Sequence, residues 1–205
     1  MGRGPEAERR VEHWSLLTTL TDFTNPGEID VFIDEHSVAW LERHMEREGF
    51  LDGAQMAWSF RMLRPNHLVW SYVIQHYLYG EEPAPFDVLY WNMDSTRLPA
   101  RMHSFYLREL YLANHMAQTD RLVLAERPID LGRIREPLYA VGTEQDHIAP
   151  WQETFKTAGL VGSEVRYVLA TSGHILGIMS PPVEPPKRRY WAGDAERAFE
   201  LFAEM

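Results

Sequence analysis

Cysteine is absent from this chain of 205 residues, which excludes disulfide bonds, thiolate metal sites and a cysteine nucleophile within it. No apolar run approaches the ~20 residues that cross a bilayer. Residues 1–10 carry three Arg and two Glu in place of the apolar stretch of a signal peptide. We therefore expect a cytoplasmic protein with no membrane span.

Basic residues are fewer than acidic ones: the chain has 20 Lys and Arg and 30 Asp and Glu, which gives a net charge of −10. A nucleic-acid binder needs a basic face that neutralises phosphates, so this balance argues against that class. The His residues lack a paired metal-ligand spacing, since His36 and His44 are eight positions apart and His67 and His76 are nine. We expect no metal site.

What the chain does have is the composition of a globular protein, 45% apolar and 24% charged, and a hydrophobic period that changes along its length. Residues 14–20 form a compact apolar and β-branched run, which predicts a buried strand. From about 28 to 118 the period is helical. The first helix face is predicted to hold Ile29, Phe32, Ile33, His36 and Trp40.

Two more helices are predicted in this block. One is capped by Asn66 and stopped by Gly80, and the other opens at Pro99. From about 119 the pattern returns to strands and short helices. The predicted strands lie at 122–124, 138–141 and 165–169, and the predicted helices at 152–158 and 195–202.

The alternation of strands and helices after residue 119 predicts a parallel sheet built from βαβ units. We therefore expect an α/β fold with a helical cap inserted between sheet elements. The expected parts are residues 1–24 (a strand of the core), 25–118 (the helical cap) and 119–205 (the rest of the core).

Asp146 and His174 each follow a predicted strand by a short loop. The carboxyl ends of parallel strands meet at one edge of a sheet, where α/β enzymes keep their catalytic groups. A buried Asp that accepts the imidazole Nδ1–H fixes the tautomer and leaves Nε2 free as a base. Gly173 allows a tight turn beside the base. The alternative interpretation is a loop Asp that caps the helix at Trp151 and a structural His.

A nucleophile for this pair is missing from the sequence. A nucleophile elbow needs small residues two positions before and after the nucleophile. Of the two G-x-x-x-G spacings, Gly49 to Gly53 has Leu51 at its centre and Gly173 to Gly177 has Ile175, and neither residue can attack a carbonyl. Ser172 precedes the loop glycine but has no elbow around it. The nucleophile is expected upstream of residue 11.

Three other features each have two interpretations. His147, next to Asp146, is either a substrate-contacting group or a polar loop residue. The segment Trp91-Asn92-Met93-Asp94 is either functional or a structural turn. The basic run Lys187-Arg188-Arg189 is either a contact for an anionic group such as a phosphate or a solvated charged stretch.

Many short motifs, in order along nearly the whole chain, resemble the C-terminal half of class I poly(3-hydroxyalkanoate) synthases. The matching stretches are Leu16-Leu17-Thr18-Thr19-Leu20-Thr21-Asp22-Phe23, Phe60-Arg61-Met62-Leu63-Arg64-Pro65-Asn66, Phe86-Asp87-Val88-Leu89-Tyr90-Trp91-Asn92, Asp94-Ser95-Thr96-Arg97-Leu98-Pro99, Pro128-Ile129-Asp130-Leu131, Asp146-His147-Ile148-Ala149-Pro150-Trp151 and Ser172-Gly173-His174-Ile175. Tyr106-Leu107-Arg108 favours class I over the medium-chain class.

The resemblance implies an α/β-hydrolase core with a helical cap and a Cys–His–Asp triad that polymerises (R)-3-hydroxyacyl-CoA with release of CoA. It implies that His174 is the general base, that Asp146 orients it, that His147 lies at the substrate site and that Trp91 lines the substrate route or a dimer contact. No cofactor is implied, since the CoA thioester is a substrate. Implied partners are the growing polyester chain, the polyhydroxyalkanoate granule surface, and a second copy or an N-terminal half.

The family's Cys lies upstream of the segment that matches residues 11–23, so we expect a fragment that is inactive alone, because a base without a nucleophile cannot form an acyl-enzyme. Two alternatives remain. One is a non-catalytic module that binds granules or a partner through its aromatic-rich helical block. The other is a serine esterase or depolymerase that uses Ser172.

Overall fold

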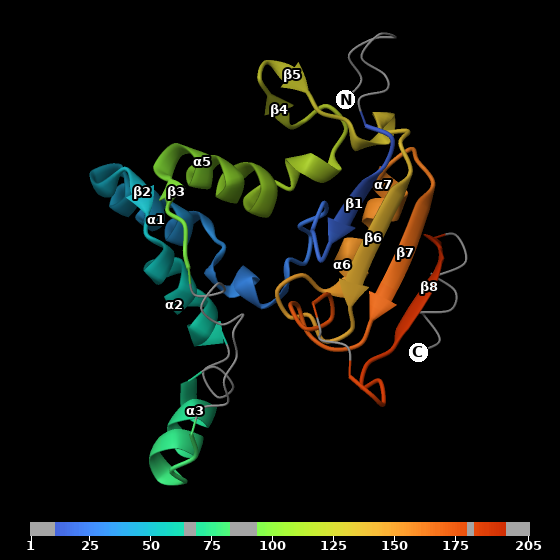
Figure 1. Ribbon diagram of the computed structural model, residues 1–205. Coiled ribbons are helices and arrows are strands. Elements are labelled where there is room, and N and C mark those ends of the chain that lie inside the picture. Colours follow the sequence, from blue (N-terminus) through green and yellow to red (C-terminus); the bar gives the residue numbers. More distant parts are fainter. Residues whose placement is uncertain (1–10, 64–68, 83–93, 180–182, 196–205) are drawn as a thin grey trace. The chain divides into compact units, whose positions relative to one another are not determined.

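The computed structural model describes residues 11–63, 69–82, 94–179 and 183–195 (Figure 1). The chain divides into two compact units. The first unit combines Met1–Asp30 with Arg108–Met205, and the second is Val31–Leu107.

The first unit is built on a four-stranded sheet in the order β1-β6-β7-β8 (Figure 1). Strands β1 (Trp14–Leu17), β6 (Leu138–Thr143) and β7 (Val165–Ala170) are parallel, and β8 (Tyr190–Asp194) runs antiparallel to β7. All but the second residue of β6 and of β7 are buried, as expected for the central strands of a parallel sheet. The predicted α/β class with a parallel sheet is therefore confirmed.

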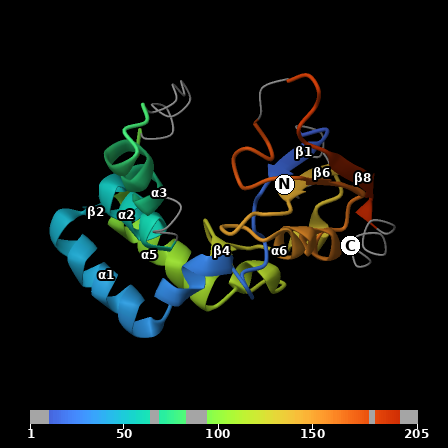
Figure 2. The ribbon, with the colours of Figure 1, turned by 90° about the horizontal axis from the view of Figure 1, so that it is seen from below.

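Two short helices form the crossover from β6 to β7. These are α6 (Trp151–Phe155) and α7 (Thr157–Leu160), and Figure 2 shows α6 beside the sheet. They replace the single helix predicted at 152–158. The core between these helices and the sheet consists of Leu131, Leu138, Ala140, Phe155, Val161, Val165, Tyr167 and Leu169.

Strand β1 is shorter and more exposed than the sequence predicts. It ends at Leu17 because Thr18 takes a positive φ of 44°. Its residues alternate between half-buried and exposed, and Leu17 is 48% exposed. The prediction of a buried strand over 14–20 is wrong because β1 pairs only with β6 and lies at the edge of the described sheet.

The apolar run 122–124 does not join the parallel sheet. Instead β4 (Val123–Leu124) pairs antiparallel with β5 (Arg127–Pro128) in an exposed two-stranded hairpin. Ala125 and Glu126 both have positive φ, 49° and 61°, which is the geometry of a two-residue hairpin turn. The prediction of a sheet strand here is wrong, because an apolar triplet does not specify its partner. Of residues 122–124, only Leu122, just before β4, is buried.

The second unit is mainly helical. Helix α1 (Glu35–Glu48) begins at Asp34, whose carboxylate accepts hydrogen bonds from the N–H groups of His36 and Ser37, and ends at Gly49 with φ 79°. A 3-10 helix, Gly27–Phe32, precedes it. The extended backbone of Asp34 breaks the single helix that the sequence predicts. Its predicted apolar face is also wrong, since Trp40 is 62% exposed and α1 buries Val38 and Met45.

The remaining helices largely follow the predictions. Helix α5 (Ala100–Phe105) begins after Pro99 and continues as π-helical turns over Tyr106–Leu112. The helix predicted between Asn66 and Gly80 is seen as α3 (Ser71–Val73) and the π-helical Ile74–Leu78, with Asn66 outside the described residues. The other elements are β2 (Phe50–Leu51), β3 (Leu98–Pro99), α2 (Gly53–Leu63) and the 3-10 turns His115–Ala117 and Leu131–Arg133.

Within the ranges that the structure describes, no helix has the length and apolar character needed to cross a bilayer. The helix predicted at 195–202 lies almost wholly outside the described residues, as does Trp91.

Candidate active site

Two loops meet at the carboxyl ends of β6 and β7. Two backbone hydrogen bonds continue the strand pairing into these loops: Glu144 N–H donates to Ala170 O at 2.9 Å, and Gln145 N–H donates to Ser172 O at 3.0 Å. The first loop carries Asp146 and the second His174. The structure therefore brings together the two residues that the sequence analysis paired.

The Asp146 carboxylate and the His174 imidazole form a hydrogen bond of 2.7 Å between Oδ2 and Nδ1. Asp146 Oδ1 accepts hydrogen bonds from the backbone N–H groups of Ile148 and Ala149, both at 2.9 Å. Its side chain is fully buried, whereas the His174 side chain is 31% exposed. Backbone N–H groups of its own loop thus hold the buried aspartate in place, and the histidine is partly accessible to solvent.

Burial acts to raise the pKa of Asp146, but hydrogen bonds from His174, Ala149 and Ile148 together with the His174 charge outweigh it, so the pKa lies below 3.8. Asp146 is therefore ionised at neutral pH and can only accept hydrogen bonds. His174 Nδ1 must then be the donor, and in the neutral form of the ring Nε2 keeps its lone pair. This arrangement gives the imidazole the tautomer that a general base requires.

His147 also has a defined position through its backbone. Its carbonyl accepts a hydrogen bond of 3.1 Å from Glu28 N–H, and a Cβ on Gly27 would lie 2.6 Å from the same oxygen. Gly27 has φ 82°, so both space and backbone conformation require glycine there. The turn at Asn25-Pro26-Gly27 therefore supports the Asp146 loop, a role that only the tertiary contact reveals.

A cavity of about 460 Å³ lies on the sheet near the histidine loop. Thr171 and Gly177, on either side of His174 in the chain, contribute to its wall. Its floor includes Leu17 and Val141, and Arg188 and Arg189 also line it. The basic run predicted as an anion contact or a solvated stretch therefore contributes two arginines, Arg188 and Arg189, to the lining of a cavity that also includes apolar residues.

No group of three or more His, Asp or Glu able to hold a metal ion occurs among the described residues. The site defined so far is a buried aspartate and a half-exposed histidine at the carboxyl edge of a parallel sheet. This constellation is typical of α/β enzymes with an acid–base pair.

Sequence comparison places the chain among known proteins. The poly(3-hydroxyalkanoate) polymerase subunit PhaC of Rhizobium meliloti is 44% identical over 192 residues, which cover 94% of this chain and 31% of that protein. The poly(3-hydroxyalkanoate) polymerase of Methylorubrum extorquens is 46% identical over 195 residues, 94% of this chain and 32% of that protein. The subunit PhaC of Cupriavidus necator is 41% identical over 186 residues, 88% of this chain and 31% of that protein.

No protein-family model matches the chain. The relatives nevertheless confirm the recognition made from the motifs: over nearly its whole length, the chain corresponds to part of a poly(3-hydroxyalkanoate) polymerase. It spans about a third of the length of the curated relatives it matches.

Proposed function

We propose that the chain carries the acid and base of a poly(3-hydroxyalkanoate) polymerase site, which joins (R)-3-hydroxyacyl groups from CoA thioesters into a polyester and releases CoA. The observation that carries this proposal is the 2.7 Å hydrogen bond between buried Asp146 and His174 in a chain related to these polymerases. The chain contains no cysteine. The thiol nucleophile of the proposed triad therefore comes from outside these 205 residues.

In the proposed reaction, His174 Nε2 accepts the proton of the thiol, whose sulfur attacks the thioester carbonyl. The carbon–sulfur bond to CoA breaks, and the departing thiolate takes up the proton from the imidazolium. His174 then accepts a proton from the 3-hydroxyl group of the next acyl unit, whose oxygen attacks the carbonyl of the acyl-enzyme. An ester bond forms, the carbon–sulfur bond to the cysteine breaks, and the cysteine thiolate takes the proton back from the imidazolium. Asp146 stabilises the imidazolium in each step through the Nδ1 hydrogen bond.

The finer fold is also part of the proposal. We assign the β1-β6-β7 sheet to a partial α/β-hydrolase core, formed by residues 1–24 and 119–205, and residues 25–118 to an inserted helical cap. Support comes from the chain itself, which leaves the sheet after β1 and returns to it through β6, with the compact unit Val31–Leu107 between them.

The cavity, whose lining includes the histidine loop at Thr171 and Gly177 but neither Asp146 nor His174, is proposed to hold part of an acyl-CoA substrate. Its apolar floor suits an acyl chain, and Arg188 and Arg189 suit the phosphates of CoA. His147 and Trp91 are proposed as further substrate contacts. The proposed partners are the growing polyester, the granule surface and either a second copy or a polypeptide that supplies the cysteine, with the cytoplasm as the place of action.

The test is release of CoA from (R)-3-hydroxybutyryl-CoA by the chain, alone and mixed with a polypeptide that contains the family's cysteine segment. We expect turnover only in the mixture, and its loss in the mixture made with His174→Gln. Turnover by the chain alone would contradict the need for an external thiol. Absence of turnover in every mixture would count against the polymerase proposal.

A second candidate function is a non-catalytic module that binds granules or a partner. The observation in its favour is a run of exposed apolar side chains along one helical segment of the second unit, namely Trp70, Tyr72, Ile74, Tyr77, Leu78 and Tyr79. Co-sedimentation with polyester granules tests it, and the result should be unchanged by His174→Ala. Failure to sediment would exclude it.

The serine esterase alternative depends on Ser172, which sits in the histidine loop with a positive φ of 92°. A fluorophosphonate probe would label an activated serine, and Ser172→Ala would abolish that label. The polymerase proposal predicts no labelling.

A further inference from the structure

Thr143, the last residue of β6, is completely buried and contacts the aspartate loop through its hydroxyl group. Thr143 Oγ1 donates a hydrogen bond of 3.4 Å to Asp146 Oδ2, the oxygen that also accepts the His174 Nδ1 proton. The Asp146 backbone N–H in turn donates to Thr143 O at 3.2 Å. The carboxylate oxygen that faces the histidine therefore has two side-chain donors, His174 at 2.7 Å and Thr143 at the longer distance of 3.4 Å.

The methyl group of Thr143 contacts the histidine loop at Gly177. A Cβ added to Gly177 would overlap Thr143 Cγ2 and would lie 2.9 Å from Thr143 Cβ and 3.0 Å from Gly173 O. Because a β-branched side chain is stiff and Thr143 has no exposed surface, its methyl group cannot retreat. Gly177 is therefore required by space.

Gly177 is linked to His174 through a helical turn. Gly177 N–H donates to Gly173 O at 2.8 Å, and Met179 N–H donates to Ile175 O at 2.8 Å. His174 lies inside this turn, so the position of Gly177 against Thr143 sets where the imidazole can lie.

We propose that Thr143 is a positioning residue and that Gly177 is the surface against which it packs, an arrangement we term the Thr143–Gly177 seat. The hydroxyl group orients the Asp146 carboxylate, and the methyl group fixes the turn that carries His174. The Thr143–Gly177 seat adds two residues to the proposed acid–base site, and its role in catalysis rests on the proposed function. It also gives a role to the G-x-x-x-G spacing of Gly173 and Gly177, which holds no nucleophile.

The experiment measures the tautomer of His174 in the isolated chain from the ¹⁵N shifts of its ring nitrogens, at a pH where the imidazole is neutral. Thr143→Val keeps the methyl shape and removes the hydroxyl, and Thr143→Ser does the reverse. We expect Thr143→Val and Gly177→Ala each to reduce the share of the Nδ1–H tautomer. Since Thr143→Ser deletes the methyl that a Gly177 Cβ would meet, the double variant T143S/G177A should regain part of what G177A loses.

Matched controls separate positioning from stability. Thr157→Val removes another buried threonine hydroxyl, bonded to Thr21 at 2.6 Å, and Gly159→Ala adds a Cβ where no atom lies within 4 Å. Both should leave the His174 shifts unchanged. Two results would overturn the proposal. One is a T143V variant whose His174 ¹⁵N shifts equal those of the wild type. The other is a T143S/G177A double variant that regains none of the Nδ1–H tautomer lost in G177A. If G177A does not fold, the comparison of T143V with T143S decides. The proposal then requires that T143V, which lacks the hydroxyl, has less of the Nδ1–H tautomer than T143S, which keeps it.

The readout needs no turnover, so the two proposals can fail separately. Altered tautomers with no CoA release from any mixture would leave the seat standing and remove the polymerase function. CoA release from the mixture with unchanged tautomers in the variants would support the polymerase function and overturn the Thr143–Gly177 seat.

Discussion

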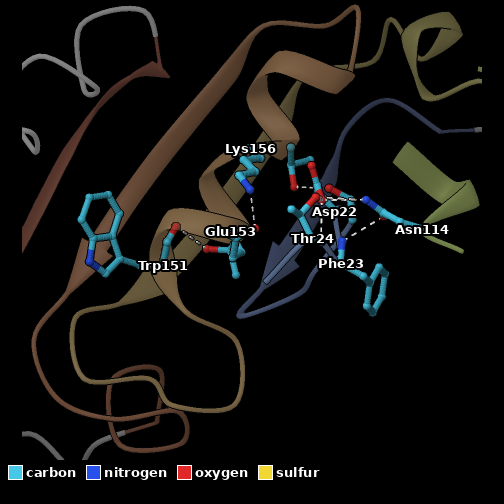
Figure 3. Close-up of polar contacts among 10 residues, drawn as sticks. Asp22, Phe23, Thr24, Asn114, Trp151, Glu153 and Lys156 are labelled. Atoms are coloured by element: carbon cyan, nitrogen blue, oxygen red, sulfur yellow. Dashed lines mark hydrogen bonds and ion pairs between the residues drawn. The ribbon is translucent and has the colours of Figure 1, made fainter. Parts of the chain in front are cut away.

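The side-chain amide of Asn114 donates a hydrogen bond of 2.9 Å to Asp22 Oδ1, although 92 positions separate the two residues (Figure 3). The Asn114 side-chain carbonyl also accepts a hydrogen bond of 2.9 Å from Phe23 N–H. Asp22 follows β1, and Asn114 precedes β4. These contacts join the two chain segments between which the second unit is inserted, and they lie within the first unit.

Replacing Asn114 should therefore destabilise the first unit. Asn114→Ala removes the side-chain hydrogen bonds and places alanine at φ 49°, so we expect a loss of about 1–3 kcal/mol in the free energy of unfolding. Asn114→Gly tolerates that backbone conformation and should lose less. Urea unfolding measures both, and equal stability of N114A and wild type would refute the role of this contact.

The Asp146–His174 pair should be required for turnover by the mixture of this chain with the polypeptide that contains the cysteine segment. Asp146→Asn keeps the size of the side chain but no longer favours the Nδ1–H tautomer, so we expect kcat to fall by roughly 10⁴-fold. The assay is CoA release by the mixture that includes the cysteine polypeptide. Asp194→Asn, at an exposed position on β8, is the matched control and should retain activity.

Acid should destabilise the first unit through Asp146 and Asp22. The pKa of each lies below 3.8: burial acts to raise it, but hydrogen bonds from His174 and backbone N–H groups at Asp146, and from Thr24 and Asn114 at Asp22, lower it further. Their stabilisation is present above the unfolded pKa and is lost as the pH falls through the folded pKa. Thermal unfolding from about pH 7 to about pH 3 should show this loss, and D146N should show less of it.

The second unit should carry a separate pH dependence through His103 on α5. His103 is buried, its Nδ1 atom lacks a hydrogen-bond partner in the described part of the chain, and desolvation lowers its pKa below 6.5. The folded unit keeps the ring neutral, while the unfolded chain takes up a proton as the pH falls below about 6.5. Stability is therefore full above that pH and declines below it.

His103→Leu should remove this decline between about pH 7.5 and about pH 5.5, measured as the urea midpoint at each pH. His13→Gln, at an exposed position of the first unit, should leave the decline unchanged. An unaltered pH dependence in H103L would show that another group titrates.

The part of the site built on β6 and β7 was predictable because its signals are local. Continuous apolar runs marked both strands, and parallel strands place their carboxyl ends together. The proximity of Asp146 and His174 therefore followed from chain order alone.

Other features depend on contacts that the local sequence does not encode. The apolar residues 122–124 suit a hairpin as well as a sheet, and positive φ at Ala125 and Glu126 decides the outcome. The contact of Thr143 with Gly177 joins residues 34 positions apart, so neither residue signals it separately.

The hydrogen bonds that extend the β6–β7 pairing past the strand ends have a consequence for assembly. Because Asp146 and His174 are only 28 positions apart, the crossover between them closes a short loop, which costs little chain entropy. The acid–base pair can therefore form as soon as this single βαβ unit folds. If the proposed polymerase function holds, a thiol from outside these 205 residues would meet a histidine whose ring is already aligned.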